Sequence, residues 1–379
     1  MMKKLFYASV LSLMLLEFAN VYFIMPMPGS QEMNSIDLAY FLYTWRWVWR
    51  GILGIFTILS FKKAFNRSKF FSLLFLIGLV AVIYTLNFEM AADTMFLQTS
   101  NLTMKNAVEN KVDTSRIVMG IQYNGQAKAY PIQYLGYHHQ VFDTIDSKPI
   151  IITYCTVCRT GRVFSTMING QKESFRLVGM DHFNALFEDK TTKSWWRQAT
   201  GEAIAGMLKG QVLPELSSSQ MALKQWLALY PNSLIMQPDQ NFKVEYDSLS
   251  NYEAGRRRGL TRRDSLSWQD KSWIIGVSIG NESKAYDWNV LEKQRIIYDL
   301  LDNQPIAIIL ANDNKSFLAL HRTDKNQTFT LMNDTLIDQQ NHYNLMGVSL
   351  NPSLPNLEKI NAYQEYWHSW RTFHPLTKK

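Results

Sequence analysis

The stretch "GIQYNGQAKAYPIQYLGYHHQVFDTIDSKPIIITY" at residues 120–154 has a counterpart later in the chain, "GVSIGNESKAYDWNVLEKQRIIYDLLDNQPIAIIL" at residues 276–310. The two stretches align without a gap at an offset of 156 residues (276 − 120). Identical residues coincide at Gly120/Gly276, Lys128/Lys284, Ala129/Ala285, Tyr130/Tyr286, Leu135/Leu291, Asp143/Asp299, Asp146/Asp302, Pro149/Pro305 and Ile150/Ile306. Self-similarity at a fixed offset indicates a repeated structural unit. The sequence therefore predicts a region built from two related repeats.

The pattern inside the first repeat is that of β-structure. Residues 116–123 and 126–132 alternate in polarity and are separated by Asn124-Gly125, a strong hairpin signal. The run 148–154 predicts a buried strand, and a second Asn-Gly pair at Asn169-Gly170 predicts a second hairpin. Residues 218–231 and 356–375 have the composition of helices. The predicted fold class is α+β, dominated by antiparallel sheet.

Hydrophobic residues are concentrated at the start of the chain. The segments 5–25, 36–61 and 70–88 are long enough to span a bilayer as helices, although the second contains Arg46 and Arg50. A cleaved signal peptide is the alternative for the first segment, but no small-residue cleavage site follows it. We predict a membrane anchor of three transmembrane helices at residues 1–88, with an ion pair between Glu17 and Arg50.

The charges of the connecting loops predict the orientation of this anchor. Residues 26–37 contain no Lys or Arg, whereas residues 62–69 contain four. Because basic loops stay in the cytoplasm, the N-terminus is expected to be cytoplasmic and everything after residue 88 extracytoplasmic. We divide that part into a first repeat at residues 89–235 and a second, degenerate repeat with a C-terminal helix at residues 236–379.

The chain is basic, with a formal net charge of +7. Its densest basic cluster lies at residues 256–263. In an extracytoplasmic location nucleic acid is not an expected partner. The cluster is expected to be a solvated interdomain linker, and acidic headgroups or acidic side chains are the alternative partners. The expected partners are the lipid bilayer and an extracytoplasmic protein or small molecule.

The only two cysteines, Cys155 and Cys158, lie two residues apart in the first repeat. At the matching positions the second repeat has Ala311 and Asn314, so the shared fold does not require thiols. Haem attachment needs a histidine after the second cysteine, where this chain has Arg159. A thioredoxin-type site needs a helix after the first cysteine, and here a strand pattern follows. A structural disulfide, a redox pair and a metal site remain open.

Nearby residues extend the candidate site. His138 and His139 occur only in the first repeat. Two thiols are half of a tetrahedral copper or zinc site, and His138, His139 or His182 could supply the remaining ligands. We assign Cys155, Cys158 and His138 as candidate catalytic residues. Residues 179–206 are rich in polar and aromatic side chains among glycines, which is typical of loops that line a cleft. The candidate substrate-binding residues are Arg159, Ser194, Trp196, Gln198 and Glu202.

The segments "ITYCTVCRTGRVF" (152–164), "ING" (168–170) and "TTKSWWRQATGEAIAG" (191–206) together resemble the family named domain of unknown function 3179. The resemblance covers roughly residues 112–235. The family's strand, histidine and cysteine-turn motifs match Tyr130, Pro131, His138, Tyr154, Cys155, Cys158 and Thr160, and its last motif matches Ser194, Trp196, Gln198, Gly201, Glu202 and Gly206.

The chain departs from the family pattern at several positions. His139 replaces an acidic residue, Thr156 replaces a proline, Arg159 replaces a glycine, and residues 185–190 keep one further segment only loosely. The family name assigns no activity, so whether the protein is an enzyme stays open. We expect a membrane-anchored extracytoplasmic protein whose CxxC/His site serves thiol–disulfide or metal chemistry. The alternative is a non-catalytic binding or assembly module in which the two cysteines form a structural disulfide.

Overall fold

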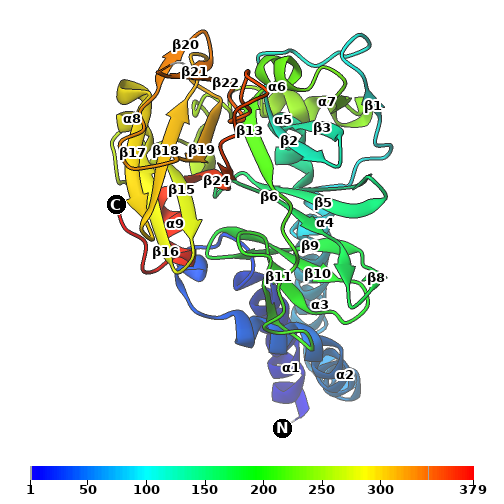
Figure 1. The fold of residues 1–379 in the computed structure, drawn as a ribbon. Helices are drawn as coiled ribbons and strands as arrows, with labels where there is room; N and C mark the ends of the chain where they lie inside the picture. Colours follow the sequence, from blue (N-terminus) through cyan, green and yellow to red (C-terminus); the bar gives the residue numbers. More distant parts are fainter. Residues whose placement is uncertain (1, 340) are drawn as a thin grey trace. The chain divides into compact units, whose positions relative to one another are not determined.

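The computed structural model describes residues 2–339 and 341–379. The chain divides into two compact units, and each is described by itself. The first unit comprises residues 1–97, 173–197 and 202–212, and the second comprises residues 98–172, 198–201 and 213–379. The overall class is α+β, with an apolar helix at the N-terminus and a β-rich C-terminal region (Figure 1).

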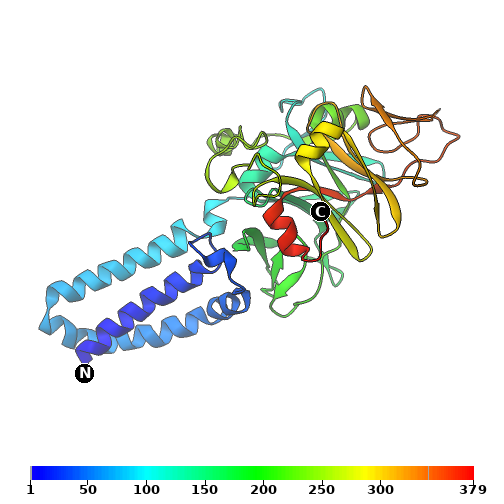
Figure 2. The ribbon, with the colours of Figure 1, turned by 90° about the vertical axis from the view of Figure 1, so that its left-hand side faces the viewer.

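The first unit combines three long helices with a four-stranded sheet. Its helices are α1 (Met2–Tyr22), η1 (Ser30–Glu32), α2 (Ile36–Arg67), α3 (Lys69–Tyr84), η2 (Thr85–Glu89) and α4 (Ala92–Met95). Its strands are β9 (Phe175–Asp181), β10 (Asn184–Asp189), β11 (Trp195–Arg197) and β12 (Ala203–Ala205), in the sheet order β12-β11-β10-β9. The helices α1, α2 and α3 run alongside one another in alternating directions (Figure 2).

All three predicted N-terminal helices are present, with shifted bounds. Two helical segments, Met2–Tyr22 and Lys69–Glu89, are long and apolar enough to cross a membrane, a property that signal sequences near an N-terminus share. The middle helix, α2, continues to Arg67 instead of ending near residue 61, because residues 62–67 contain neither glycine nor proline.

The predicted pair between Glu17 and Arg50 is confirmed. Arg50 Nη2 lies 2.6 Å from Glu17 Oε2, and Arg50 Nε donates to Glu17 Oε1 at 2.7 Å. Asn87 adds a third partner, since its amide nitrogen donates to Glu17 at 2.9 Å. Glu17 is 1 % exposed, so the carboxylate is removed from solvent and neutralised by these donors.

The sheet of the first unit packs against the segment that follows α1. The backbone N–H of Met180 donates to the carbonyl oxygen of Ile24 at 2.8 Å. A Cβ atom at Gly179 would lie only 2.2 Å from the same oxygen, so this close approach requires glycine.

The second unit begins with the first repeat-like half, which contains the cysteines. Its ordered elements are β1 (Met104–Lys105), β2 (Ile117–Tyr123), β3 (Gln126–Pro131), α5 (Ile132–His138), β4 (Gln140–Ile145), β5 (Lys148–Cys155), β6 (Thr160–Ser165), β7 (Met167–Ile168), β8 (Gln171–Lys172), β13 (Ser218–Ala222), α6 (Leu223–Leu229) and β14 (Leu234–Met236). They form the sheets β1-β14-β3-β2-β13, β4-β5-β6 and β7-β8.

The second half of this unit has the same order of principal elements. After η3 (Gln240–Phe242), α7 (Lys243–Ser248) and η4 (Gly259–Thr261), they are β15 (Trp273–Ile279), β16 (Glu282–Asp287), α8 (Trp288–Gln294), β17 (Ile296–Leu301), β18 (Gln304–Leu310), β19 (Phe317–His321), β20 (Thr330–Met332), β21 (Thr335–Asp338), β22 (Asn341–Tyr343), β23 (Lys359–Ile360), β24 (Ala362–Tyr366) and α9 (Trp367–Phe373). They form the sheets β16-β15-β24, β17-β18-β19-β23 and β20-β21-β22.

Corresponding glycines in the two halves carry the same packing. A Cβ atom at Gly120 would lie 2.3 Å from the ring of Trp226, and one at Gly276 would lie 2.2 Å from the ring of Trp370. Each indole N–H donates to a hydroxyl seven residues later, that of Ser233 at 2.7 Å or that of Thr377 at 2.8 Å. In each half, therefore, a tryptophan ring packs against the glycine of the first strand and leaves no space for a side chain at that position.

Two predicted helices are shorter than the sequence indicated. Residues 218–222 form β13, which pairs with β2, and only residues 223–229 are helical. Residues 362–366 form β24, which pairs with β15, and the C-terminal helix begins at Trp367. The predictions were wrong for the first part of each segment because pairing with a neighbouring strand overrides local helix propensity. The hairpin predicted at Asn169-Gly170 is confirmed as the pair β7-β8.

Each half places its final strand and helix against a turn of the other half. The backbone N–H of Tyr366, at the end of β24, donates to the carbonyl oxygen of Cys158 at 3.0 Å. In the reverse direction the N–H of Ala222, at the end of β13, donates to the Ser316 hydroxyl at 2.9 Å. The turn that carries the cysteines is therefore covered by residues more than 200 positions away.

Candidate functional site

The two cysteines lie on the turn between β5 and β6. Cys155 is the last residue of β5 and pairs with Thr160, the first residue of β6. The strand predicted after the turn is therefore confirmed, and no helix follows Cys155. The two cysteines form no disulfide, and their exposed fractions are 1 % and 0 %. They are close enough for the thiol of Cys155 to hydrogen-bond that of Cys158.

Burial dominates the electrostatics of Cys158. It raises the pKa of the Cys158 thiol well above its usual value, and the adjacent Cys155 sulfur raises it further. The ammonium of Lys271 acts in the opposite direction, because it stabilises a thiolate. Burial also lowers the pKa of Lys271, although the two sulfurs partly offset this effect. The Cys158 thiol is therefore held in its neutral form, with the Lys271 side chain beside it.

Lys271 connects the turn to α9. Its Nζ donates to the carbonyl oxygen of Val157 at 2.6 Å and lies 3.1 Å from Nε2 of His368. Burial lowers the pKa of His368 to about 3, and the charge of Lys271 adds to this shift. The imidazole is therefore neutral at physiological pH, and its Nε2 lies between Nζ of Lys271 and the carbonyl oxygen of Val157, which is 3.2 Å away.

Arg159 has the backbone conformation that the family's glycine would adopt. Its φ is 58°, in the left-handed region that glycine favours. The side chain is fully buried, donates to Gln364 at 2.8 Å and to the Glu253 carbonyl at 3.2 Å, and stacks on Trp273 with Cζ 3.9 Å from the ring centroid. These contacts stabilise a turn that would otherwise be strained for a non-glycine residue.

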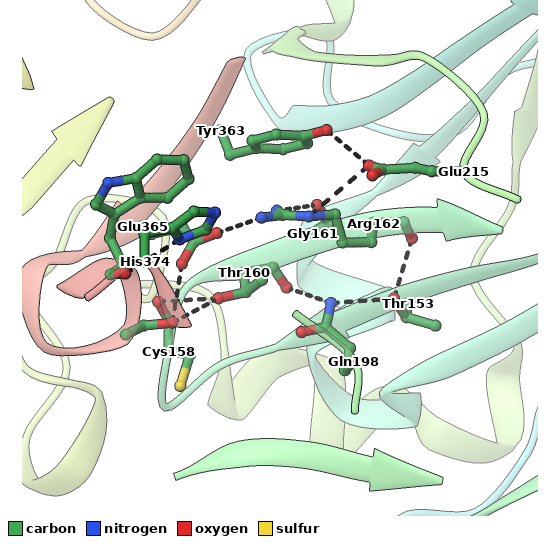
Figure 3. A network of polar contacts seen from close by, with 12 residues as sticks. Thr153, Cys158, Thr160, Gly161, Arg162, Gln198, Glu215, Tyr363, Glu365 and His374 are labelled. Carbon is green, nitrogen blue, oxygen red and sulfur yellow. Dashed lines mark hydrogen bonds and ion pairs between the residues drawn. The ribbon is translucent and has the colours of Figure 1, made fainter. Parts of the chain in front are cut away.

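A polar network underlies the turn (Figure 3). Arg162 forms a buried ion pair with Glu365, with Nη2 2.6 Å from Oε1. The other oxygen of Glu365 accepts from the Ser369 hydroxyl at 2.8 Å, and this hydroxyl lies 3.2 Å from that of Thr160. On the other side Gln198 donates at 3.0 Å to both Thr153 Oγ1 and the Thr160 carbonyl, which holds β5 and β6 together.

The two candidate histidines at the end of α5 are fully or nearly buried. Nε2 of His138 lies 2.6 Å from the hydroxyl of Tyr246, and Nδ1 of His139 lies 2.8 Å from the carbonyl oxygen of Tyr154. Burial lowers the pKa of His139 to about 4. His139 therefore joins α5 to the end of β5, next to Cys155, as a neutral hydrogen-bonding group.

The remaining candidates belong to the first unit. His182 pairs with Asp181, with Nδ1 2.7 Å from Oδ1. The Ser194 hydroxyl accepts from the Leu208 N–H at 3.0 Å, and the Trp196 indole donates to Asp189 at 2.9 Å. The Glu202 carboxylate lies 3.7 Å from Arg197. The candidates thus divide between the two units, with Gln198, Arg159, His138, His139 and the two cysteines in the second.

The geometry gives no support to the predicted metal site. Within residues 2–339 and 341–379, no group of three or more His, Cys, Asp or Glu side chains is arranged to hold a metal ion. Sequence reasoning also missed Lys271, His368 and Ser369. A second comparison within the chain could have found His368 and Ser369. Trp226 and Trp370 match at an offset of 144 (370 − 226), and the two residues before Trp370 differ from those before Trp226.

Comparison with known proteins gives a family but no characterised relative. No curated protein and no solved structure matches the chain. The model of the family DUF3179, described as a protein of unknown function, matches residues 98–377. This match contains the resemblance over residues 112–235 and extends across both halves of the second unit. The chain belongs to the DUF3179 family.

Proposed function

We propose that the protein is a membrane-anchored extracytoplasmic protein, built on two related repeats, whose Cys155/Cys158 pair performs thiol–disulfide exchange. The observation that carries the proposal is the asymmetry of the two halves. The halves share order and register, yet only one turn holds two thiols in contact, and Lys271 and Ser369 from the other half flank them. If the fold itself required the two thiols, both turns would contain them.

The surfaces of α2 and α3 support the membrane anchor. Both helices expose many large apolar side chains, including Trp47 at 68 %, Ile58 at 74 % and Phe70 at 71 %. Contiguous apolar surface of this kind is costly in water and is typical of lipid contact. The four basic residues within 62–69 favour a cytoplasmic position for that end of the helices.

The proposed exchange proceeds in two steps. The Cys158 thiolate attacks one sulfur of an external disulfide, which breaks that bond and releases the first thiolate. Cys155 then attacks the mixed disulfide, which forms the Cys155–Cys158 bond and releases the second thiolate. Two electrons pass from the protein to the external disulfide, and each released thiolate takes one of the two thiol protons. Lys271 stabilises the attacking thiolate.

Redox titration of the full-length protein in detergent tests this proposal. We expect the pair to convert between dithiol and disulfide across glutathione buffers, read by mass after alkylation. Lys271→Met should slow alkylation of Cys158 about tenfold at pH 8, because a nearby cation contributes a kcal/mol or more to thiolate stability. The matched control is Lys315→Met, since Lys315 donates to the Ser115 carbonyl at 2.6 Å beside the turn without thiols. Equal alkylation rates in the two variants would contradict the proposed role of Lys271.

The burial of both sulfurs favours a second candidate function, a binding or assembly module with a structural cysteine pair. In that case the pair would not exchange with glutathione in the folded protein. Cys155→Ser would then reduce thermal stability without changing any thiol-transfer activity. A pair that equilibrates with glutathione below the unfolding temperature would exclude this module.

A further inference from the structure

The first unit contains a cavity between the ends of its helices and its sheet. It has a volume of about 280 Å³, close to the lower size of small-molecule sites. Its lining comes from α1, α2, η2, α4 and β9. One part is apolar, including Ile24, Leu86 and Val178, and the other contains Asn20, Asn87 and the guanidinium groups of Arg46, Arg50 and Arg176. The cavity therefore has the amphiphilic character of a lipid headgroup site.

Asn20 indicates that this cavity is built for a polar ligand. The residue is 9 % exposed, and neither Nδ2 nor Oδ1 of its amide has a hydrogen-bond partner within the described part of the chain. Leaving a buried amide unsatisfied costs about 1–3 kcal/mol per group. A ligand with both a donor and an acceptor would satisfy the two atoms.

Three arginines and one acidic residue, Asp93, line the cavity, so its lining favours an anion. Arg50 is paired with Glu17, and Arg176 is paired with Glu188 at 2.9 Å and with Asp93 at 3.1 Å. Arg46 has no carboxylate within 4.0 Å among the described residues. It stacks on Tyr43, with Cζ 3.6 Å from the ring centroid, and donates to the Tyr43 carbonyl. Arg46 therefore lines the cavity without an ion-pair partner, and the unsatisfied amide of Asn20 lines the same cavity.

We infer that this cavity binds the headgroup of an anionic phospholipid, with Arg46 on the phosphate and the Asn20 amide on a headgroup hydroxyl and a phosphate oxygen. The source is the bilayer, because Trp47 lines the site and is 68 % exposed, as tryptophans often are at membrane interfaces. The acyl chains would follow the apolar faces of α2 and α3. This inference rests on the proposed membrane anchor and is independent of the cysteine chemistry.

Lipid competition tests the inference. The purified full-length protein in detergent is incubated with equal amounts of phosphatidylglycerol and phosphatidylcholine, and retained lipid is counted by native mass spectrometry. We expect retention of phosphatidylglycerol to fall about fivefold in Arg46→Gln, the typical effect of one interfacial basic residue. Asn20→Leu should also reduce retention, whereas Arg46→Lys should keep most of it. Arg67→Gln is the matched control, since Arg67 is an exposed arginine at the other end of the same helix.

The outcomes of these experiments distinguish a phospholipid site from a site for a free phosphate ester, and both from failure of the proposed membrane anchor. Equal retention of both lipids, or a loss in Arg67→Gln as large as in Arg46→Gln, would overturn the inference. Complete displacement by soluble glycerol phosphate would also overturn it, because the ligand would then be a free phosphate ester. Vesicle flotation of the wild-type chain tests the anchor separately. A protein that does not float contradicts the proposed function, whereas one that floats without lipid preference contradicts only this inference.

Discussion

The buried ion pair between Arg162 and Glu365 links the two halves of the second unit beneath the cysteine turn. Their side chains are 3 % and 1 % exposed, and the closest nitrogen and oxygen are 2.6 Å apart. Removing one member of such a pair leaves an uncompensated buried charge and costs about 3–5 kcal/mol. Removing both removes that penalty, so the double variant should be more stable than at least one of the single variants.

The structure predicts which single change is worse. After Glu365→Leu, Arg162 keeps Glu215, whose carboxylate lies 3.7 Å from Nε and is 29 % exposed. After Arg162→Met, the Glu365 carboxylate keeps the Ser369 hydroxyl at 2.8 Å but loses its ion-pair partner. We therefore expect Glu365→Leu to lower the free energy of unfolding by about 3 kcal/mol and Arg162→Met to lower it by about 5 kcal/mol.

Thermal unfolding of the full-length protein in detergent, followed by tryptophan fluorescence, measures these losses. The entropy of unfolding for the 280 residues from 98 to 377 (377 − 98 + 1) is about 0.6 kcal/mol per degree. The single changes should then lower Tm by about 5 and 8 °C. Arg371→Gln serves as the surface control, because Arg371 and its partner Asp270 are 48 % and 67 % exposed.

The double-mutant cycle tests whether Arg162 and Glu365 stabilise each other. If the losses of Arg162→Met and Glu365→Leu simply add in the double variant, the two charges do not depend on each other. That result would refute the reasoning that the pair is desolvated and mutually neutralising. A loss in Arg371→Gln equal to that in Arg162→Met would refute it as well.

Three further predictions concern other parts of the molecule. Burial lowers the pKa of His139 from 6.5 to about 4, so only the unfolded chain takes up its proton between these values. Stability should therefore fall by about 3 kcal/mol as pH drops from 6.5 to 4, and His139→Asn should flatten that slope in unfolding measured against pH. Gly120→Ala and Gly276→Ala should each cost about 1–3 kcal/mol by collision with a tryptophan, and unequal losses in chemical denaturation would contradict the matched packing of the halves. Glu17→Gln should destabilise the helices by leaving Arg50 without its carboxylate, seen as faster proteolysis within residues 1–97, and an unchanged cleavage rate would count against the pair.

Local sequence patterns determined much of the β-structure and one tertiary contact. The Asn-Gly pairs predicted their hairpins because the turn needs residues that accept a positive φ. The internal offset placed matching residues at matching strand positions, as at Lys128 and Lys284, which each bond an aspartate at 2.8 Å. Burying a charge in an apolar helix requires a partner, which is why an ion pair between Glu17 and Arg50 could be predicted from the sequence.

Other features were decided only by the tertiary structure. Residues 218–222 and 362–366 became strands because a neighbouring strand offered hydrogen bonds that local propensity cannot anticipate. The groups beside Cys158 come from Lys271 and Ser369, more than 100 residues away, because the second half folds over the first half's turn. The sequence by itself determined where the thiols lie along the chain. Their burial, and the cation beside them, depend on contacts between distant segments that only packing of the whole unit creates.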